Sequence, residues 1–175
     1  MGKSTSREVI VDAVEASTIP ATADGFADWV SPHLAALAAL AERQVGAAAG
    51  ADVVQEALLR AWRRRETFRS DRGTPRSWLV AILLDQARRH RTRWRWTNST
   101  SQQPASGLAG PSGDRVDLER AIGRLSRRQR QVVTLHYLAD LAVVEVAAVL
   151  GISESSVKTH LSAARAGLKM LLEAS

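Results

Sequence analysis

The chain has 175 residues, of which 45% are hydrophobic and 24% charged, a composition that suits one medium or two small folded domains. It contains no cysteine, which excludes a disulfide framework and a thiolate metal site. Its N-terminal stretch is interrupted by acids and its apolar runs are short, which excludes a signal peptide and a membrane span. We therefore expect a soluble, cytoplasmic protein with no membrane insertion.

The net charge of +6 is concentrated in one part of the chain. Residues 1–59 carry three Lys or Arg against eight acids, whereas residues 60–95 carry 12 Arg against three acids. Such a basic segment is typical of a protein that binds a polyanion, and the alternative is a solvated helix face. Aromatic residues lie between the arginines, which favours stacking on unpaired bases. They are Trp62, Phe68, Trp78, Trp94 and Trp96.

The N-terminal half predicts a compact helical bundle over residues 25–96, after a loose arm over residues 1–24. Apolar side chains recur every three or four residues from Phe26 to Leu40, which indicates an amphipathic helix with Trp29 in the core. A second helix is expected to start near Asp52 and to bury Trp62. Residues 69–74 break it, and Pro75 marks the start of a third helix.

A polar stretch rich in Ser, Gly, Pro and Gln predicts a flexible linker over residues 97–116. After it, residues 117–175 predict a second helical domain. Asp117 is expected to cap its first helix, and Ser126 with Gln129 forms a capping-box pattern for the next. A further helix is expected over residues 143–150. The fold class is therefore all-α, with two small helical domains joined by a linker.

The stretch "LGISESSVKTHLSAARAG" predicts a helix-turn-helix. Gly151 suits the left-handed turn, Ser153 suits the cap of the next helix, and Val157 and Leu161 lie on its apolar face. The opposite face is short-chained and polar, and it fits either a DNA major groove or water. That face consists of Glu154, Ser155, Lys158, Thr159 and Ser162.

Two families match this C-terminal half. It resembles the output domain of LuxR-type regulators and, equally, region 4 of bacterial sigma factors of the extracytoplasmic-function (ECF) group. The N-terminal half separates them because it resembles sigma region 2. The matching motifs, in order, are Asp52, Val54-Gln55-Glu56, Arg60-Ala61-Trp62, Gly73 through Trp78-Leu79, and the basic run Arg88 to Arg93.

This resemblance implies an ECF-type sigma factor that binds the clamp coiled coil and flap of core RNA polymerase and directs transcription initiation at promoter DNA. Polymerase would be bound by Asp52, Gln55, Glu56, Arg60 and Arg63. The melted minus-10 strand would be bound by Arg69, Arg72, Arg76, Ser77, Trp78, Asp85, Arg88, Arg89, Arg91 and Arg93. The duplex minus-35 element would be bound by Ser153, Ser155, Ser156, Lys158, Thr159, His160 and Arg165.

Some positions depart from the family pattern. Asp85 stands where many members have Asn, so it repels phosphate unless it accepts from a cytosine amine or pairs with Arg88 or Arg89. Ala142 replaces a usual Ser cap, and Ser162 and Ala163 replace bulkier residues. These differences predict altered promoter contacts.

Other functions are less favoured by the sequence. No His, Asp, Glu or Ser grouping has catalytic spacing, so we expect no enzymatic activity, no cofactor and no metal site. A LuxR-like regulator acting without polymerase is the alternative, followed by a protein that sequesters polymerase without reading DNA. An anti-sigma factor is a further expected partner.

Overall fold

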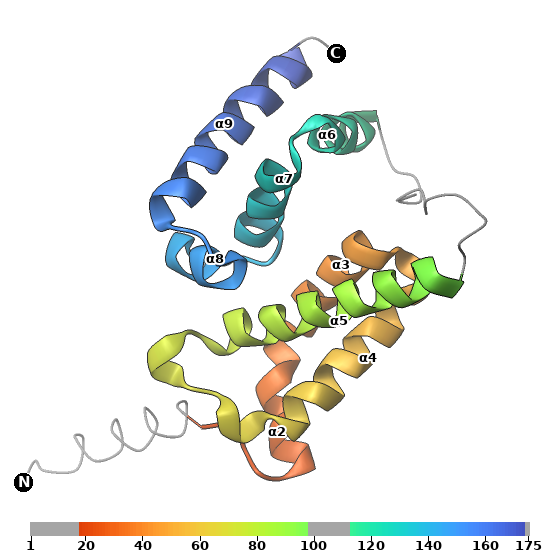
Figure 1. The fold of residues 1–175 in the computed structure, drawn as a ribbon, viewed down its shortest axis with the longest axis vertical. Coiled ribbons are helices and arrows are strands. Elements are labelled where there is room, and N and C mark those ends of the chain that lie inside the picture. Colours follow the sequence, from red (N-terminus) through yellow and green to blue (C-terminus); the bar gives the residue numbers. More distant parts are fainter. Residues whose placement is uncertain (1–17, 98–112, 174–175) are drawn as a thin grey trace, which may run out of the picture.

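The computed structural model describes residues 18–97 and 113–173 and is helical throughout its ordered elements. The helices form two groups, the N-terminal bundle of α2 to α5 and the C-terminal bundle of α6 to α9 (Figure 1). The predicted all-α fold with two helical domains is confirmed. Residues 1–17 of the predicted arm and residues 98–112 of the predicted linker lie outside the described residues. Within the described ranges, no helix is both long enough and apolar enough to cross a membrane.

The N-terminal bundle packs three long helices against one another, with a short helix at one end. Its core includes Leu40, Val80 and Leu83, whose side chains have no solvent exposure. The contacts of α3, α4 and α5 with each other hold these residues between them. The helices are α2 (Ala23–Val30), α3 (Leu34–Val45), α4 (Ala47–Arg63) and α5 (Pro75–Thr97), with 3-10 turns η1 (Ser31–His33), η2 (Arg65–Thr67) and η3 (Ser70–Arg72).

The prediction that the second helix starts near Asp52 is wrong, because α4 begins at Ala47. Gly46 has a φ of 86°, which ends helix α3, and the alanines that follow are strong helix formers. Asp52 is therefore an exposed residue inside α4 and does not cap it. Because Asp52 lies inside α4, it shares one face of this helix with Gln55 and Glu56.

Aromatic side chains fill one end of the N-terminal bundle. The ring centroids of Phe26 and Trp62 are 5.2 Å apart, those of Trp29 and Phe68 are 5.7 Å apart, and those of Phe68 and Trp78 are 5.6 Å apart. Trp29 and Trp62 are partly buried against the core, in line with the core position predicted for them. Phe68 and Trp78, whose place between arginines favoured stacking on bases, pack inside this cluster instead.

The C-terminal bundle comprises α6 (Gly113–Arg124), α7 (Arg127–Val133), the π-helical turn η4 (Thr134–Leu138), α8 (Val143–Leu150) and α9 (Glu154–Glu173). The long helix α9 packs on α6, α7 and α8. The predicted capping box is confirmed: Gln129 N donates to Ser126 Oγ at 3.3 Å, and Ser126 N donates to Gln129 Oε1 at 2.9 Å. The start of α6 differs from the prediction, because residues 113–116 are helical and Asp117 is not a cap.

The two bundles are in contact. Helix α8 packs on α5, and η4 packs on α3, so the buried side chains of both bundles belong to one apolar cluster. An open cleft of about 300 Å³ remains beside this contact. It is lined from the N-terminal bundle by Gln44, Ala81, Leu84, Asp85, Arg88 and Arg91, and from the C-terminal bundle by Arg127, Gln131, Thr134, Leu135, Val149 and Leu150.

Candidate nucleic-acid interface

The turn between α8 and α9 has the geometry of a helix-turn-helix. Gly151 ends α8 with a left-handed φ of 63°, as predicted. Ile152 N then donates to Ala147 O at 3.1 Å, which closes the turn. Ser153 caps α9 by accepting from Ser156 N at 3.2 Å. These contacts fix the direction in which α9 leaves the turn.

Helix α9 separates an apolar stripe from a polar face. Val157 has no exposed surface, and Leu161 and Ala164 are also buried in the bundle core. The polar residues predicted for the opposite face are exposed; they are Glu154, Ser155, Lys158, Thr159 and Ser162. The packing of the stripe therefore presents this face to the surroundings of the molecule.

The remaining residues predicted for duplex DNA are less available. Ser156 and His160 are half-buried, and the Ser153 hydroxyl is engaged in capping. Arg165 is exposed, but its Nε donates to the Tyr137 hydroxyl at 2.7 Å. The side chains that are both predicted and exposed without a capping role thus gather around Lys158 and Thr159, near the start of α9.

At the N-terminus of α5, Thr74 and Ser77 cap the helix reciprocally. Ser77 N donates to Thr74 Oγ1 at 3.2 Å, and the Ser77 hydroxyl donates to Thr74 O at 2.9 Å. Ser77 is 7% exposed. A DNA contact by Ser77 is therefore not supported, because its hydroxyl is buried and used in the cap.

Asp85 lies at the centre of a charge network on α5. Its carboxylate accepts from Arg88 Nη2 at 3.0 Å and from Arg89 Nε at 2.9 Å, and it lies 3.8 Å from Arg60 Nη2 on α4. Burial raises the pKa of Asp85, but the hydrogen bonds from Arg89 and Arg88 and the charges of Arg89 and Arg60 outweigh it and hold the pKa below its usual value. Of the two alternatives for Asp85, the structure shows the pairing with arginine.

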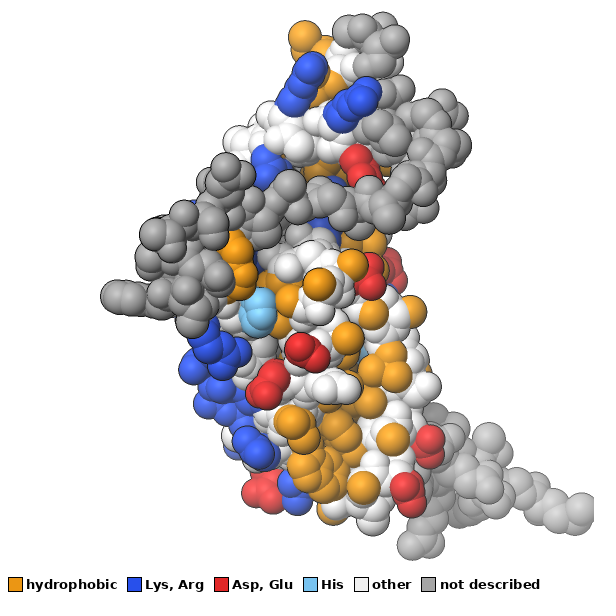
Figure 2. Space-filling model, turned by 90° about the vertical axis from the view of Figure 1, so that its right-hand side faces the viewer, with side chains coloured by type: hydrophobic (Ala, Val, Ile, Leu, Met, Phe, Trp, Pro, Cys, Tyr) orange, Lys and Arg blue, Asp and Glu red, His pale blue; other side chains and the backbone are white. Residues whose placement is uncertain are grey.

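The other arginines predicted for single-stranded DNA differ in their surroundings. Arg91 donates to Gln44 Oε1 at 2.8 Å, and Arg76 Nη1 lies 2.6 Å from Asp140 Oδ2 of the C-terminal bundle. Arg69, Arg72 and Arg93 have exposed side chains. In a side view, Lys and Arg side chains form a band along one edge of the N-terminal bundle (Figure 2).

The exposed surface of α4 carries a mixed stripe. Asp52, Gln55, Glu56 and Arg63 are exposed, as expected for residues that contact a partner. Arg60, predicted with them, is half-buried and turns toward Asp85 instead. Sequence analysis missed Leu59, which is 51% exposed in the middle of the stripe. Its spacing of three and four residues from Glu56 and Gln55 could have indicated it.

The described ranges contain no group of three His, Asp or Glu side chains that could hold a metal ion. What the site offers instead is an exposed polar helix face on α9, a guanidinium-rich surface on α5 and a mixed polar and apolar stripe on α4. These surfaces suit contacts with a groove, with phosphates and with a protein, respectively.

Comparisons with known proteins agree with this division. Residues 29–97 match the family described as Sigma-70 region 2, and residues 115–168 match Sigma-70, region 4. The chain is 33% identical over 151 residues to the ECF RNA polymerase sigma factor SigL of Mycobacterium tuberculosis, covering 81% of this chain and 85% of SigL. It is 33% identical over 140 residues to the RNA polymerase sigma factor CnrH of Cupriavidus metallidurans, covering 70% of this chain and 73% of CnrH.

Two solved structures are similar to the fold. The sigma factor RpoE from Bartonella quintana, in complex with the anti-sigma factor NepR, aligns with a TM-score of 0.71 and 26% identity over 85% of this chain and 96% of RpoE. CnrH in complex with the cytosolic domain of CnrY aligns with a TM-score of 0.65 and 28% identity over 96% of this chain and 97% of CnrH. The LuxR-like alternative is not favoured, because its output domain leaves the region 2 match unexplained. The chain belongs to the ECF group of RNA polymerase sigma factors.

Proposed function

We propose that the three surfaces divide the work of a sigma factor, and that α4 docks on the clamp coiled coil of core RNA polymerase. Asp52, Gln55, Glu56 and Arg63 supply polar contacts there, and Leu59 adds an apolar contact at their centre. An exposed apolar side chain inside a polar stripe is typical of a protein interface. Arg60 has a different role in this proposal, because it supports Asp85 from α4.

The arginines of α5 and of the loop before it hold the melted minus-10 strand in this proposal. Guanidinium groups bind phosphate oxygens whether or not the bases are paired, which suits a strand that has left the duplex. Arg69, Arg72, Arg88, Arg89 and Arg93 are exposed for this role. The aromatic cluster around Trp78 supports the loop from beneath and does not stack on the bases.

Helix α9 reads the minus-35 element as duplex in this proposal, and the C-terminal bundle contacts the polymerase flap. The single observation that carries it is the orientation of α9: a fully buried apolar stripe opposes an exposed face of short polar side chains around Lys158. Short side chains allow a helix to approach base edges in the major groove, and a lysine adds a phosphate contact. The chain itself contributes recognition, whereas polymerase carries out the chemistry in the cytoplasm.

A reconstitution experiment tests the proposed function. The purified chain is added to bacterial core RNA polymerase with a library of promoter fragments, and run-off transcripts are sequenced. We expect transcripts that start at a shared promoter class and that are lost when the chain is omitted. A chain that fails to bind core polymerase, or that binds it without directing any start site, contradicts the proposal.

We also propose that an anti-sigma factor binds this chain, because the similar structure of RpoE is a complex with the anti-sigma factor NepR and the similar structure of CnrH is a complex with the cytosolic domain of CnrY. The proposed interface includes the exposed stripe of α4, since occupying it would exclude polymerase. Replacing Leu59 with Asp places a charge at its centre. This change is expected to weaken binding to core polymerase and to the regulator together, as measured by competition between them; loss of only one contradicts a shared interface.

A further inference from the structure

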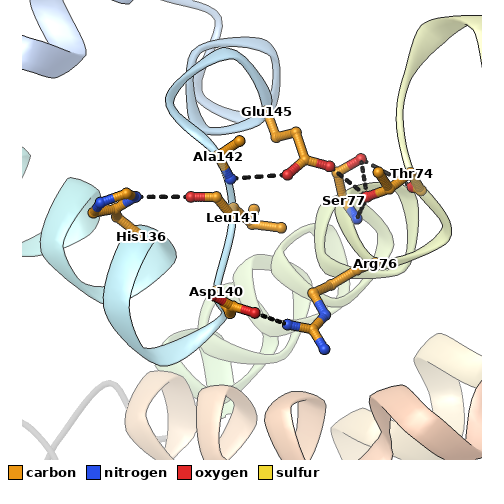
Figure 3. A network of polar contacts seen from close by, with 8 residues as sticks. All are labelled: Thr74, Arg76, Ser77, His136, Asp140, Leu141, Ala142 and Glu145. Carbon is orange, nitrogen blue, oxygen red and sulfur yellow. Dashed lines mark hydrogen bonds and ion pairs between the residues drawn. The ribbon is translucent and has the colours of Figure 1, made fainter.

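Two acids of the C-terminal bundle contact the start of α5 (Figure 3). Asp140 Oδ2 lies 2.6 Å from Arg76 Nη1, and the Thr74 hydroxyl donates to Glu145 Oε1. Both acids belong to the acidic segment, residues 139–145, which comprises the connection after η4 and the first residues of α8. The start of α5, in turn, belongs to the surface proposed above for single-stranded DNA.

The backbone holds both acids in place. Asp140 has a left-handed φ of 52° and lies between Ala139 and Leu141, whose side chains are buried. Glu145 accepts from Ala142 N through Oε2 at 2.8 Å while Oε1 accepts from Thr74. The same carboxylate therefore stabilises the start of α8 and bridges to α5. These backbone contacts hold both carboxylates so that they face the start of α5.

A carboxylate that contacts a guanidinium occupies the place of a phosphate oxygen. We propose that the acidic segment is an internal competitor of single-stranded DNA: in the chain without polymerase it covers the start of α5, and it must leave before the minus-10 strand binds there. The proposal rests on the assignment of this surface to single-stranded DNA. The duplex-reading face of α9 stays exposed in the same arrangement, so closure blocks one DNA site and leaves the other available.

The polar contacts of the closed arrangement, which lie beside the apolar contacts of α8 with α5 and of η4 with α3, are weak. The Asp140 side chain is 85% exposed, so water and salt screen its ion pair. The cleft between the bundles leaves part of the contact unpacked. Arg91 and Arg127 face this cleft with the same charge, and burial and the charge of Arg127 lower the pKa of Arg91. Because attraction and repulsion oppose each other at this contact, a partner that binds the open arrangement moderately better can shift the equilibrium from the closed to the open arrangement.

The test uses the full chain without polymerase and the double variant Asp140→Asn/Glu145→Gln. Asn tolerates the left-handed backbone at 140, and Gln keeps the capping-box position at 145. The control Glu66→Gln/Asp71→Asn removes the same charge from exposed positions of the connection before α5 and leaves both contacts intact. Circular dichroism verifies that both variants keep the helical fold.

Two readings are taken on each protein. The first is the distance distribution between spin labels at Ala48→Cys and Ala166→Cys, exposed positions in the two bundles of a chain that has no other cysteine. The second is the affinity for a labelled single-stranded DNA of random sequence and for a random-sequence duplex. Random sequences suffice because phosphate contacts do not depend on sequence.

In the double variant, we expect longer label distances, a roughly two- to tenfold gain in single-strand affinity and a smaller gain in duplex affinity, since two exposed polar contacts are lost. The control is expected to keep the wild-type distances and to gain less. Unchanged distances overturn the proposal, and so do longer distances without a gain in single-strand affinity beyond the control. Run-off transcription by the wild-type holoenzyme decides the proposed function separately, because that assay detects promoter-directed start sites whether or not the free chain is closed.

Discussion

Helices α5 and α9 both carry a surface proposed for DNA, but the protein holds the two surfaces differently. On α9 a buried apolar stripe fixes the helix, and the polar face opposite is exposed. On α5 the basic side chains are engaged by acids of the chain itself, Asp85 from the same helix and Asp140 from the other bundle. The surface proposed for duplex DNA is thus exposed, whereas the surface proposed for single-stranded DNA would exchange internal partners for phosphates.

The difference follows from charge density. Short hydroxyl-bearing side chains and one lysine create little repulsion on α9, and the hydroxyls of Ser155 and Thr159 bond within the helix and its cap rather than to a carboxylate. Arg60, Arg88 and Arg89 together would repel one another across the junction of α4 and α5, and Asp85 offsets that repulsion. Under the proposed function, the same pairing would limit how strongly this surface binds a melted strand.

The largest expected effect comes from breaking the stripe that presents α9. Leu161→Ala removes a side chain that is 3% exposed, and it is expected to destabilise the C-terminal bundle by about 2–5 kcal/mol. Hydrogen exchange of α8 and α9 amides measures the change. Lys158→Ala is the control on the opposite face, and equal destabilisation by both would contradict the separation of the two faces.

Neutralising the basic surface of α5 is expected to have the next largest effect. Arg88→Gln with Arg89→Gln removes two proposed phosphate contacts, each worth about 0.5–1.5 kcal/mol net because both guanidinium groups exchange Asp85 for phosphate, so promoter melting should fall by roughly tenfold or more. Permanganate reactivity of the minus-10 region measures melting, and gel filtration with core polymerase measures docking. Loss of docking to the same extent as melting would show that this surface binds protein.

A smaller effect is expected on the duplex side. Lys158→Ala removes one phosphate contact from α9, so the slope of log affinity against log salt for minus-35 duplex should decrease in magnitude by about one. Fluorescence anisotropy at several salt concentrations gives that slope. The variant Lys169→Ala, at the far end of the same helix, serves as the matched control. An unchanged slope for Lys158→Ala would remove this lysine from the groove.

The smallest effect concerns Asp85. Asp85→Asn leaves Arg88 and Arg89 without a carboxylate competitor. The affinity of the holoenzyme for single-stranded minus-10 DNA should therefore rise roughly two- to fivefold, which corresponds to the free energy of a partly exposed ion pair. Competition binding with unlabelled single strands measures it. A loss of affinity instead would mean that Asp85 contacts a base or holds the arginines in their binding geometry.

The periodicity of the sequence predicted the α9 surface well, because a stripe at three- and four-residue spacing determines which side chains face outward. The turn at Gly151 and the cap at Ser153 were also predictable, since each has a local backbone reason. The start of α4 was predicted wrongly because the alanines after Gly46 are flanked by glycines, a pattern typical of a turn. In the structure these alanines form the first turn of α4.

The single-strand surface was less predictable because its environment depends on distant residues. Thr74 and Glu145 are 71 positions apart in the chain, and no local pattern indicates their contact. Trp78 lies between arginines in a pattern typical of base stacking, yet its ring packs on Trp29 and Phe68. Ser77 likewise looked available until its reciprocal bonds with Thr74 showed that it is a capping residue.

The central claim, that α9 reads duplex and α5 holds single strand, is tested most directly with two DNA fragments of one promoter identified by run-off transcription. One fragment is a minus-35 duplex, and the other is a fork with a single-stranded minus-10 segment and no minus-35 element. Holoenzymes carrying Lys158→Ala or Arg88→Gln/Arg89→Gln are titrated with both. We predict that the first variant loses affinity only for the duplex and the second only for the fork; equal losses on both fragments would contradict the division.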